Sequence, residues 1–88
     1  MNENTAKILS ATVNAAVVQL PGRKFPGMVI QGDTLKILTG QADYLQEKLG
    51  DAADEEIVYT IKAMRDSLSA RLVIYEKVLQ ENGIGLPY

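Results

Sequence analysis

The segment Leu20–Thr34 constrains the fold of this chain more than any other part of the sequence. It holds two prolines, three glycines, the adjacent cations Arg23 and Lys24, and the only phenylalanine, Phe25. Proline fixes its own backbone and glycine adopts conformations that other residues avoid, so no regular helix is expected to run through this segment. The chain is therefore predicted to be helical on both sides of the segment, within a single domain.

Length and charge limit the classes of protein to which the chain can belong. Its 88 residues are enough for one domain with a thin core, because a chain of this size buries only roughly 60–65% of its unfolded surface. Association with further copies would enlarge that core. The formal net charge of −2 argues against duplex nucleic acid as the main partner, since such binding needs a broad basic surface. A small ligand with two or three phosphates needs only a local group of cations.

The residue types that most enzymes use are missing. The sequence has no cysteine and no histidine, so thiolate chemistry is excluded and the commonest general base and metal ligand are absent. The carboxylates between Asp51 and Glu56 are better explained as caps of a helix start than as a cation site. We therefore expect no enzyme, no cofactor and no bound metal. The N-terminus lacks the features of a signal peptide and no apolar run is long enough to span a membrane, which predicts a cytoplasmic protein.

The spacing of apolar residues predicts an all-α fold. The predicted segments are an N-terminal helix over 1–20, a loop over 21–33, an antiparallel helical hairpin over 34–82 and a tail over 83–88. In the first segment Leu9, Val13, Ala16 and Leu20 recur at steps of three and four, and Asn4 or Thr5 is the expected cap. The valines between Val13 and Leu20 also fit a strand, but helix is favoured. Met28–Ile30 is too short to predict a sheet.

Two apolar stripes define the expected hairpin. The first stripe consists of Leu35, Leu38, Ala42, Leu45 and Leu49. The second consists of Ile57, Ile61, Met64, Leu68, Leu72, Tyr75 and Leu79. Asp33 or Thr34 is expected to cap the first helix and Gly50 to end it, with a turn at 51–54. Asp54 begins the second helix and Asn82–Gly83 ends it.

The second helix of the hairpin has more apolar surface than one neighbour can cover. Tyr59, Ala63, Ala70 and Ile74 lie opposite its main stripe, and the two alanines would allow another helix to approach closely. This pattern predicts a homo-oligomer. The alternative is a three-helix monomer in which the N-terminal helix covers that face.

The loop contains the candidate ligand site. Arg23 suits a bidentate contact with a phosphate, and Lys24 adds a mobile charge. Backbone N–H groups around Gly27 or at the helix start after Gly32 complete the expected anion site, although Asp33 would repel a phosphate there. Phe25 either stacks on a base or is buried in the core. Arg65 and Arg71 could reach a neighbour's loop in an oligomer and contribute to a shared pocket. The default is that they are solvated or paired with a nearby carboxylate.

The L-P-G-R-K-F-P-G loop, together with this layout, resembles the phage anti-CBASS protein 2 family, whose members share a helical hairpin with an anti-Thoeris family. Proteins of that family sequester the cyclic nucleotides of bacterial defence systems. The resemblance implies a hexamer that binds cyclic di- and trinucleotides between protomers without cleaving them, with Lys24 as the phosphate-binding cation. The chain departs from the family because it has no aromatic residue before Phe25, where Ile8 and Leu9 stand instead.

A protein-binding module, such as a toxin-immunity protein, is the alternative function. The acidic balance of the chain and the second apolar face of the long helix support it. A third possibility is that the loop is purely structural.

Overall fold

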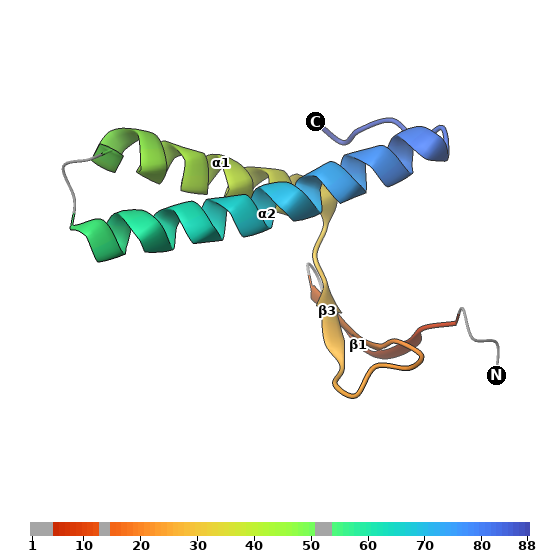
Figure 1. Cartoon of the computed structure of the whole chain (residues 1–88). Coiled ribbons are helices and arrows are strands. Elements are labelled where there is room, and N and C mark those ends of the chain that lie inside the picture. Colours follow the sequence, from red (N-terminus) through yellow and green to blue (C-terminus); the bar gives the residue numbers. More distant parts are fainter. Residues whose placement is uncertain (1–4, 13–14, 51–53) are drawn as a thin grey trace. The chain divides into compact units, whose positions relative to one another are not determined.

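The structure is a computed structural model that describes residues 5–12, 15–50 and 54–88, with the backbone alone at 11, 12 and 15. It consists of two compact units, Met1–Gln31 and Gly32–Tyr88. The first, the strand unit, is a three-stranded sheet, and the second, the hairpin unit, is a pair of helices (Figure 1). The all-α prediction is therefore wrong, since the chain combines helices with an antiparallel sheet.

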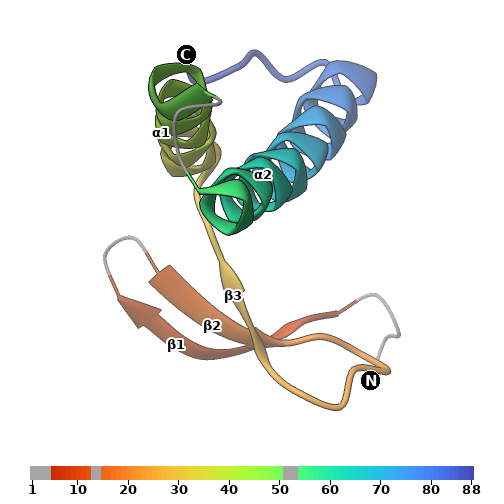
Figure 2. The same ribbon diagram turned by 60° about the vertical axis from the view of Figure 1, so that its left-hand side comes forward.

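The sheet of the strand unit has the order β1-β2-β3 and is antiparallel throughout (Figure 2). Its strands are β1 (Lys7–Thr12), β2 (Ala15–Gln19) and β3 (Gly27–Val29). Along β1 and β2, Ile8 lies opposite Val18 and Ser10 lies opposite Val17, so the register shifts at Leu9. The extra residue forms a bulge, which bends a strand and increases its twist.

The predicted N-terminal helix is wrong because the same apolar residues suit a strand. Valine is branched at Cβ and loses side-chain freedom in a helix, and β2 contains Val17 and Val18 in succession. The turn after β2 also returns the chain, so backbone groups of β2 can pair with β3 as well as with β1. The strand alternative for this region is correct over Ala15–Gln19. The predicted cap Asn4 and the stripe residue Val13 lie outside the described residues.

The expectation that Met28–Ile30 is too short to belong to a sheet is also wrong. Gly27–Val29 pairs with β2, with Met28 opposite Val17. Three residues are enough here because β3 adds to a hairpin that β1 and β2 already form.

The hairpin unit has two helices where the apolar spacing predicted them, α1 (Gly32–Leu49) and α2 (Glu55–Glu81). The side chain of Asp54 caps α2 by accepting a hydrogen bond of 2.8 Å from the backbone N–H of Glu56. Gly50 follows α1 with φ +46°, and Asn82 caps the C-terminus of α2. The expected turn residues 51–53 lie outside the described residues.

The start of α1 differs from the prediction. The helix begins at Gly32, so Asp33 and Thr34 lie within its first turn rather than at the capping position. The negative charge of Asp33 still favours the helix there, because it lies near the positive end of the helix dipole.

Small residues bring α1 close to α2. The buried face of α1 is Gly32, Leu35, Thr39 and Ala42, at steps of three and four, and Ala42 is only 1% exposed. The hydroxyl of Thr39 donates a hydrogen bond of 2.8 Å to the carbonyl of Leu35, so this buried polar group is satisfied. From α2, Leu72 is the buried residue among those described. A contact face of this kind permits a short distance between the helix axes.

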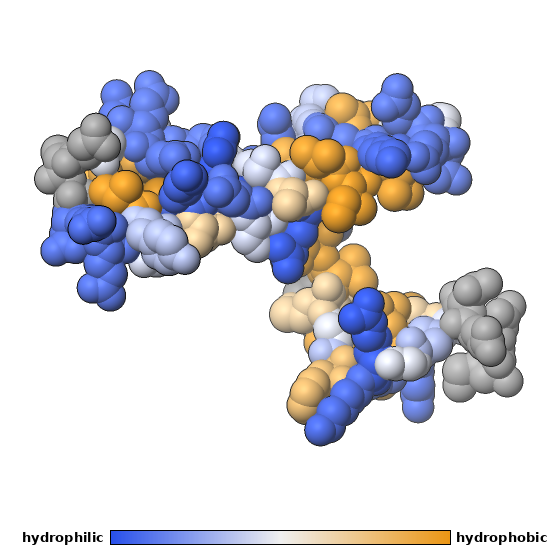
Figure 3. All heavy atoms as spheres, viewed as in Figure 1, coloured by the Kyte–Doolittle hydropathy of each residue, from blue (hydrophilic) through white to orange (hydrophobic). Residues whose placement is uncertain are grey.

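Because so few side chains are buried, both units leave apolar surface exposed. Figure 3 shows apolar residues at the surface of each unit. The stripe residues Leu38, Leu45 and Leu49 of α1 lie at the edge of the contact with α2 and are 37–40% exposed.

The C-terminal tail folds back over the hairpin (Figure 1). The hydroxyl of Tyr88 donates a hydrogen bond of 2.6 Å to Oε2 of Glu76 on α2, and Nζ of Lys36 on α1 lies 5.3 Å from the centre of the Tyr88 ring. The tail thus contacts both helices. Partial desolvation of the phenol and its hydrogen bond to Glu76 raise the pKa of Tyr88 to about 12.

The contact between Gly32 and Tyr75 predicts opposite effects for two glycine substitutions. A Cβ at Gly32 would overlap the Tyr75 ring, whereas a Cβ at Gly40, also in α1, would meet open space. Gly32→Ala should lower the free energy of unfolding by about 1–3 kcal/mol, because the ring must move. Gly40→Ala should raise it by about 1 kcal/mol through helix propensity. Urea unfolding followed by circular dichroism measures both, and two changes of the same sign would contradict this packing.

The hydrogen bond between Tyr88 and Glu76 is expected to stabilise the fold in a way that depends on pH. The phenol of Tyr88 holds its proton more tightly in the folded chain, where its pKa is about 12, than in the unfolded chain, where the ordinary value is about 10. The tail contact should therefore stabilise the fold fully below about pH 10 and be lost as the pH rises through about 12. The tyrosinate absorbance of the wild type minus that of Tyr88→Phe isolates this titration. Glu76→Gln is the control, and it should move the midpoint down; a wild-type midpoint near 10 would contradict the contact.

Candidate functional site

A tight turn fixes the start of the β2–β3 loop. The N–H of Arg23 donates a hydrogen bond of 3.3 Å to the carbonyl of Leu20, and Gly22 between them has φ +74°. Proline at the second position and glycine with positive φ at the third are what a type II turn requires. The side-chain amide of Gln19 donates a second hydrogen bond, of 2.7 Å, to the carbonyl of Arg23. The backbone of Arg23 is thus held from both sides.

A hollow of about 280 Å³ lies beside this turn, at one end of the sheet. Its lining residues are Thr5, Lys7, Gln19, Leu20, Pro21, Gly22 and Arg23. Lys7 belongs to it because β1 pairs with β2 so that Lys7 lies opposite Gln19. Two cationic residues, Lys7 and Arg23, therefore line one small hollow together with polar groups. This combination suits a single anionic group such as a phosphate.

Lys24 and Phe25 follow directly in the loop. Phe25 is 74% exposed, so the interpretation of Phe25 as a core residue is wrong. Nζ of Lys24 lies 5.3 Å from the centre of the Phe25 ring, within the range of a cation–π contact. At an exposed position such a contact is worth only about 0.5–1 kcal/mol, so a ligand can displace the ammonium from the ring.

The backbone N–H groups around Gly27 and at the start of α1 suit an anion site less well than the sequence indicated. Gly27 is the first residue of β3 and lies opposite Val18 in the sheet, so it is part of the strand ladder rather than of a free loop. At the start of α1, Gly32 is buried against the Tyr75 ring and Asp33 places a carboxylate in the first turn. The cations of the loop and of β1, rather than a helix start, are therefore the candidate groups for contact with an anion.

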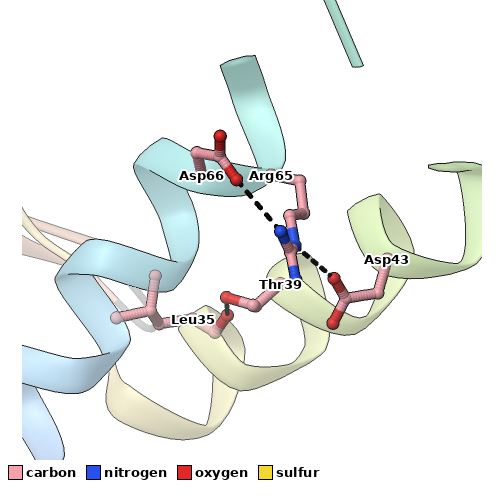
Figure 4. A network of polar contacts seen from close by, with 5 residues as sticks. All are labelled: Leu35, Thr39, Asp43, Arg65 and Asp66. Carbon is pink, nitrogen blue, oxygen red and sulfur yellow. Dashed lines mark hydrogen bonds and ion pairs between the residues drawn. The ribbon is translucent and has the colours of Figure 1, made fainter. Parts of the chain in front are cut away.

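Arg65 and Arg71 belong to α2 and have partners within the hairpin unit. Nε of Arg65 donates to Oδ1 of Asp43 on α1 at 2.8 Å, and a terminal nitrogen donates to Asp66 at 3.0 Å (Figure 4). The hydrogen bond to Asp43, followed by that to Asp66, raises the pKa of Arg65. Arg71 donates to the carbonyl and the hydroxyl of Ser67, at 3.0 and 2.6 Å. Arg65 thus makes the carboxylate contacts that were the alternative to a ligand role, whereas Arg71 is exposed and contacts Ser67 one turn earlier on the same helix.

Lys7, Gln19 and Thr5 are site residues that the sequence did not reveal. In a helix over 1–20, Lys7 and Gln19 would lie about 18 Å apart along the axis, whereas in the sheet they are direct neighbours. The signal for this pairing was the strand pattern of the valines in β2. The expected helix over that segment is incompatible with this pairing.

Two further features are absent from the residues that the structure describes. Neither α1 nor α2 combines the length and apolar character that crossing a membrane requires. Within the same residues, no three carboxylates lie close enough to one another to hold a metal ion.

Comparison with known proteins gives a family without an assigned activity. A sequence model described as "Family of unknown function (DUF6959)" matches residues 1–88, the whole chain. Searches of curated proteins and of solved structures found no match.

The turn at Gly22 predicts a local loss of stability that a second glycine does not share. Gly22→Ala forces a Cβ into the left-handed region, whereas Gly27→Ala changes an extended residue with open space around it. Gly22→Ala should cost about 1 kcal/mol, equivalent to about five-fold faster amide hydrogen exchange in β2. Gly27→Ala should leave that exchange within two-fold of the wild type, by the roughly neutral effect of an unstrained substitution. Equal rates of amide hydrogen exchange in the two variants would show that the turn at Gly22 does not stabilise the sheet.

Proposed function

The chain belongs to this family of unknown function, DUF6959, and we propose that it binds small phosphate-bearing ligands without converting them. The observation that carries the proposal is the grouping of Lys7, Arg23, Lys24 and exposed Phe25 at the loop end of the strand unit. These groups match the two parts of a nucleotide, which are a phosphate and a flat base.

The distribution of charge along the chain supports an anionic ligand. Residues 1–31 contain three cations, Lys7, Arg23 and Lys24, against one carboxylate, Glu3. Residues 32–88 contain six cations against ten carboxylates. The net charge is therefore +2 for the strand unit and −4 for the hairpin unit, which together give the −2 of the whole chain. All cations of the strand unit lie in or beside the candidate site.

We propose a cyclic di- or trinucleotide as the ligand. Three cations are too few for duplex nucleic acid but match the charge of a ligand with two or three phosphates. The Arg23 guanidinium can contact one phosphate with two N–H groups, and the Phe25 ring can stack on a base, a contact worth about 1–3 kcal/mol. The resemblance to the phage anti-CBASS protein 2 family supports the same class. Binding without turnover would lower the free concentration of a bacterial signalling nucleotide in the cytoplasm and so antagonise anti-phage defence.

A protein-binding module such as a toxin-immunity protein is the second candidate. Tyr59 and Ile74 on α2 favour it, since their side chains are 74% and 63% exposed. This function would depend on α2 and not on the loop. Substitutions in the two places therefore separate the candidates.

Calorimetric titration with cyclic di- and trinucleotides, and with linear dinucleotides as controls, tests the proposal. Arg23→Ala and Lys24→Ala should each weaken binding by about 10–100-fold, because a hydrogen bond to a charged group is worth about 1.5–3 kcal/mol. Lys62→Ala removes an exposed cation from α2 and is the matched control, with unchanged affinity expected. The ligand should be recovered intact.

Two results would contradict the proposal. One is the absence of binding by the folded wild-type chain to every cyclic nucleotide. The other is an affinity that Arg23→Ala and Lys24→Ala leave unchanged, which would place the ligand elsewhere on the molecule.

A further inference from the structure

The surface of α2 opposite its buried residue Leu72 has a row of exposed residues. From Glu56 the row runs through Tyr59, Ala63, Ala70 and Ile74 to Lys77, with steps of three, four, seven, four and three residues. These steps follow from the helical period, which also places Glu81 on this face. The row is distinguished by its side chains, with a carboxylate at one end, an ammonium at the other, large side chains inside them and alanines at the centre. At 3.6 residues per turn the six positions lie within an arc of about 60°, opposite the buried Leu72.

A row with opposite charges at its two ends fits a second copy of the same helix in antiparallel orientation. A two-fold axis between Asp66 and Ser67 would place Glu56 opposite Lys77 of the other copy, Tyr59 opposite Ile74, and Ala63 opposite Ala70. Every contact then occurs twice, as an interface of two-fold symmetry requires. We propose that α2 pairs with α2 of a second copy in this register.

The chemistry of each position agrees with this arrangement. The central alanines are small, so the two helices can approach closely at the axis. Beyond them, the large exposed side chains of Tyr59 and Ile74 would cover each other. At the ends, the carboxylate of Glu56 would meet the ammonium of Lys77, whose side chain is 73% exposed and whose partner within its own chain, Glu81, lies at a loose 3.9 Å. The charges are complementary in this register.

The residues beside the two-fold axis, Asp66 and Ser67, are also compatible with the antiparallel pair. Two copies of Asp66 would approach each other there, and Arg65 lies 3.0 Å from each carboxylate and offsets the repulsion. The hydroxyl oxygen of Ser67 accepts from Arg71 at 2.6 Å, so its hydrogen is available to donate to Asp66 of the other copy. The overlap from position 56 to position 77 is about 32 Å long, about six helical turns.

This inference does not depend on the proposed ligand, because the row belongs to α2 and the candidate site belongs to the strand unit. It goes beyond a statement of self-association, since it fixes the helix, the orientation and the register. It also names the occupant of the apolar face that a toxin-immunity function would use.

Disulfide trapping tests the register. Because the chain has no native cysteine, only the introduced cysteines can form a disulfide. Ala63→Cys and Ala70→Cys are prepared as separate full-length chains. Opposed positions should come within the 4.4–6.8 Å between Cα atoms that a disulfide needs, whereas two copies of position 63 would be offset by about 10 Å along the axis. Oxidation of the mixture should therefore give a covalent dimer, and oxidation of either chain alone should give at least ten-fold less.

A matched control and a charge exchange complete the experiment. Gln41→Cys lies on α1 and should not be trapped with either α2 variant. In sedimentation equilibrium, Glu56→Lys and Lys77→Glu should each weaken the dimer about ten-fold, because two pairs per dimer become repulsive. The double variant should recover the affinity, although both changes are unfavourable for the helix dipole.

Three outcomes would overturn the pairing. The first is a wild-type chain that remains monomeric at every concentration. The second is trapping of Ala63→Cys with itself as strong as in the mixture, which would indicate a parallel pair or another register. The third is a dimer of the double variant, Glu56→Lys with Lys77→Glu, that is weaker than the dimer of either single variant.

Discussion

The close contact between α1 and α2 is the constraint on which the rest of the hairpin depends. It is possible because Gly32, Thr39 and Ala42 present little volume to α2, and Tyr75 occupies the space that a side chain at Gly32 would need. The same feature limits what the hairpin can bury, since small residues remove little apolar area from water. The thin core follows from the close packing, and the exposed apolar rows on both helices follow from the thin core.

The two units divide the properties of the chain between them. The hairpin unit has most of the carboxylates and the large apolar surface, whereas the strand unit has three cations around a loop with a fixed turn. Arg65 illustrates the difference, because its two carboxylate partners leave it a structural role between helices. Residues 1–31, by contrast, contain a single carboxylate, Glu3, for three cations. Ligand binding and self-association can therefore occupy different parts of one short chain.

Part of the candidate site was predictable because it is local. Arg23, Lys24 and Phe25 are adjacent in the sequence, so their grouping needed no knowledge of the fold. The contribution of Lys7 was not predictable in the same way, since it depends on which segments pair in the sheet. The loss of the helix start as an anion site had a similar cause. It depends on where α1 begins and on Tyr75, which is more than forty residues further along the chain.

The sequence by itself determined the elements whose signals are local and strong. Asp54, Gly50 and Asn82–Gly83 mark the helix ends through caps and positive φ, and long apolar stripes mark the helices between them. The tertiary structure decided the state of β1 and β2, because a short apolar segment suits a helix and a strand almost equally until a neighbour supplies hydrogen bonds. It also decided that Phe25 is exposed and that Thr39 is buried. Burial depends on the elements that pack against a residue, and the residue's own identity does not fix it.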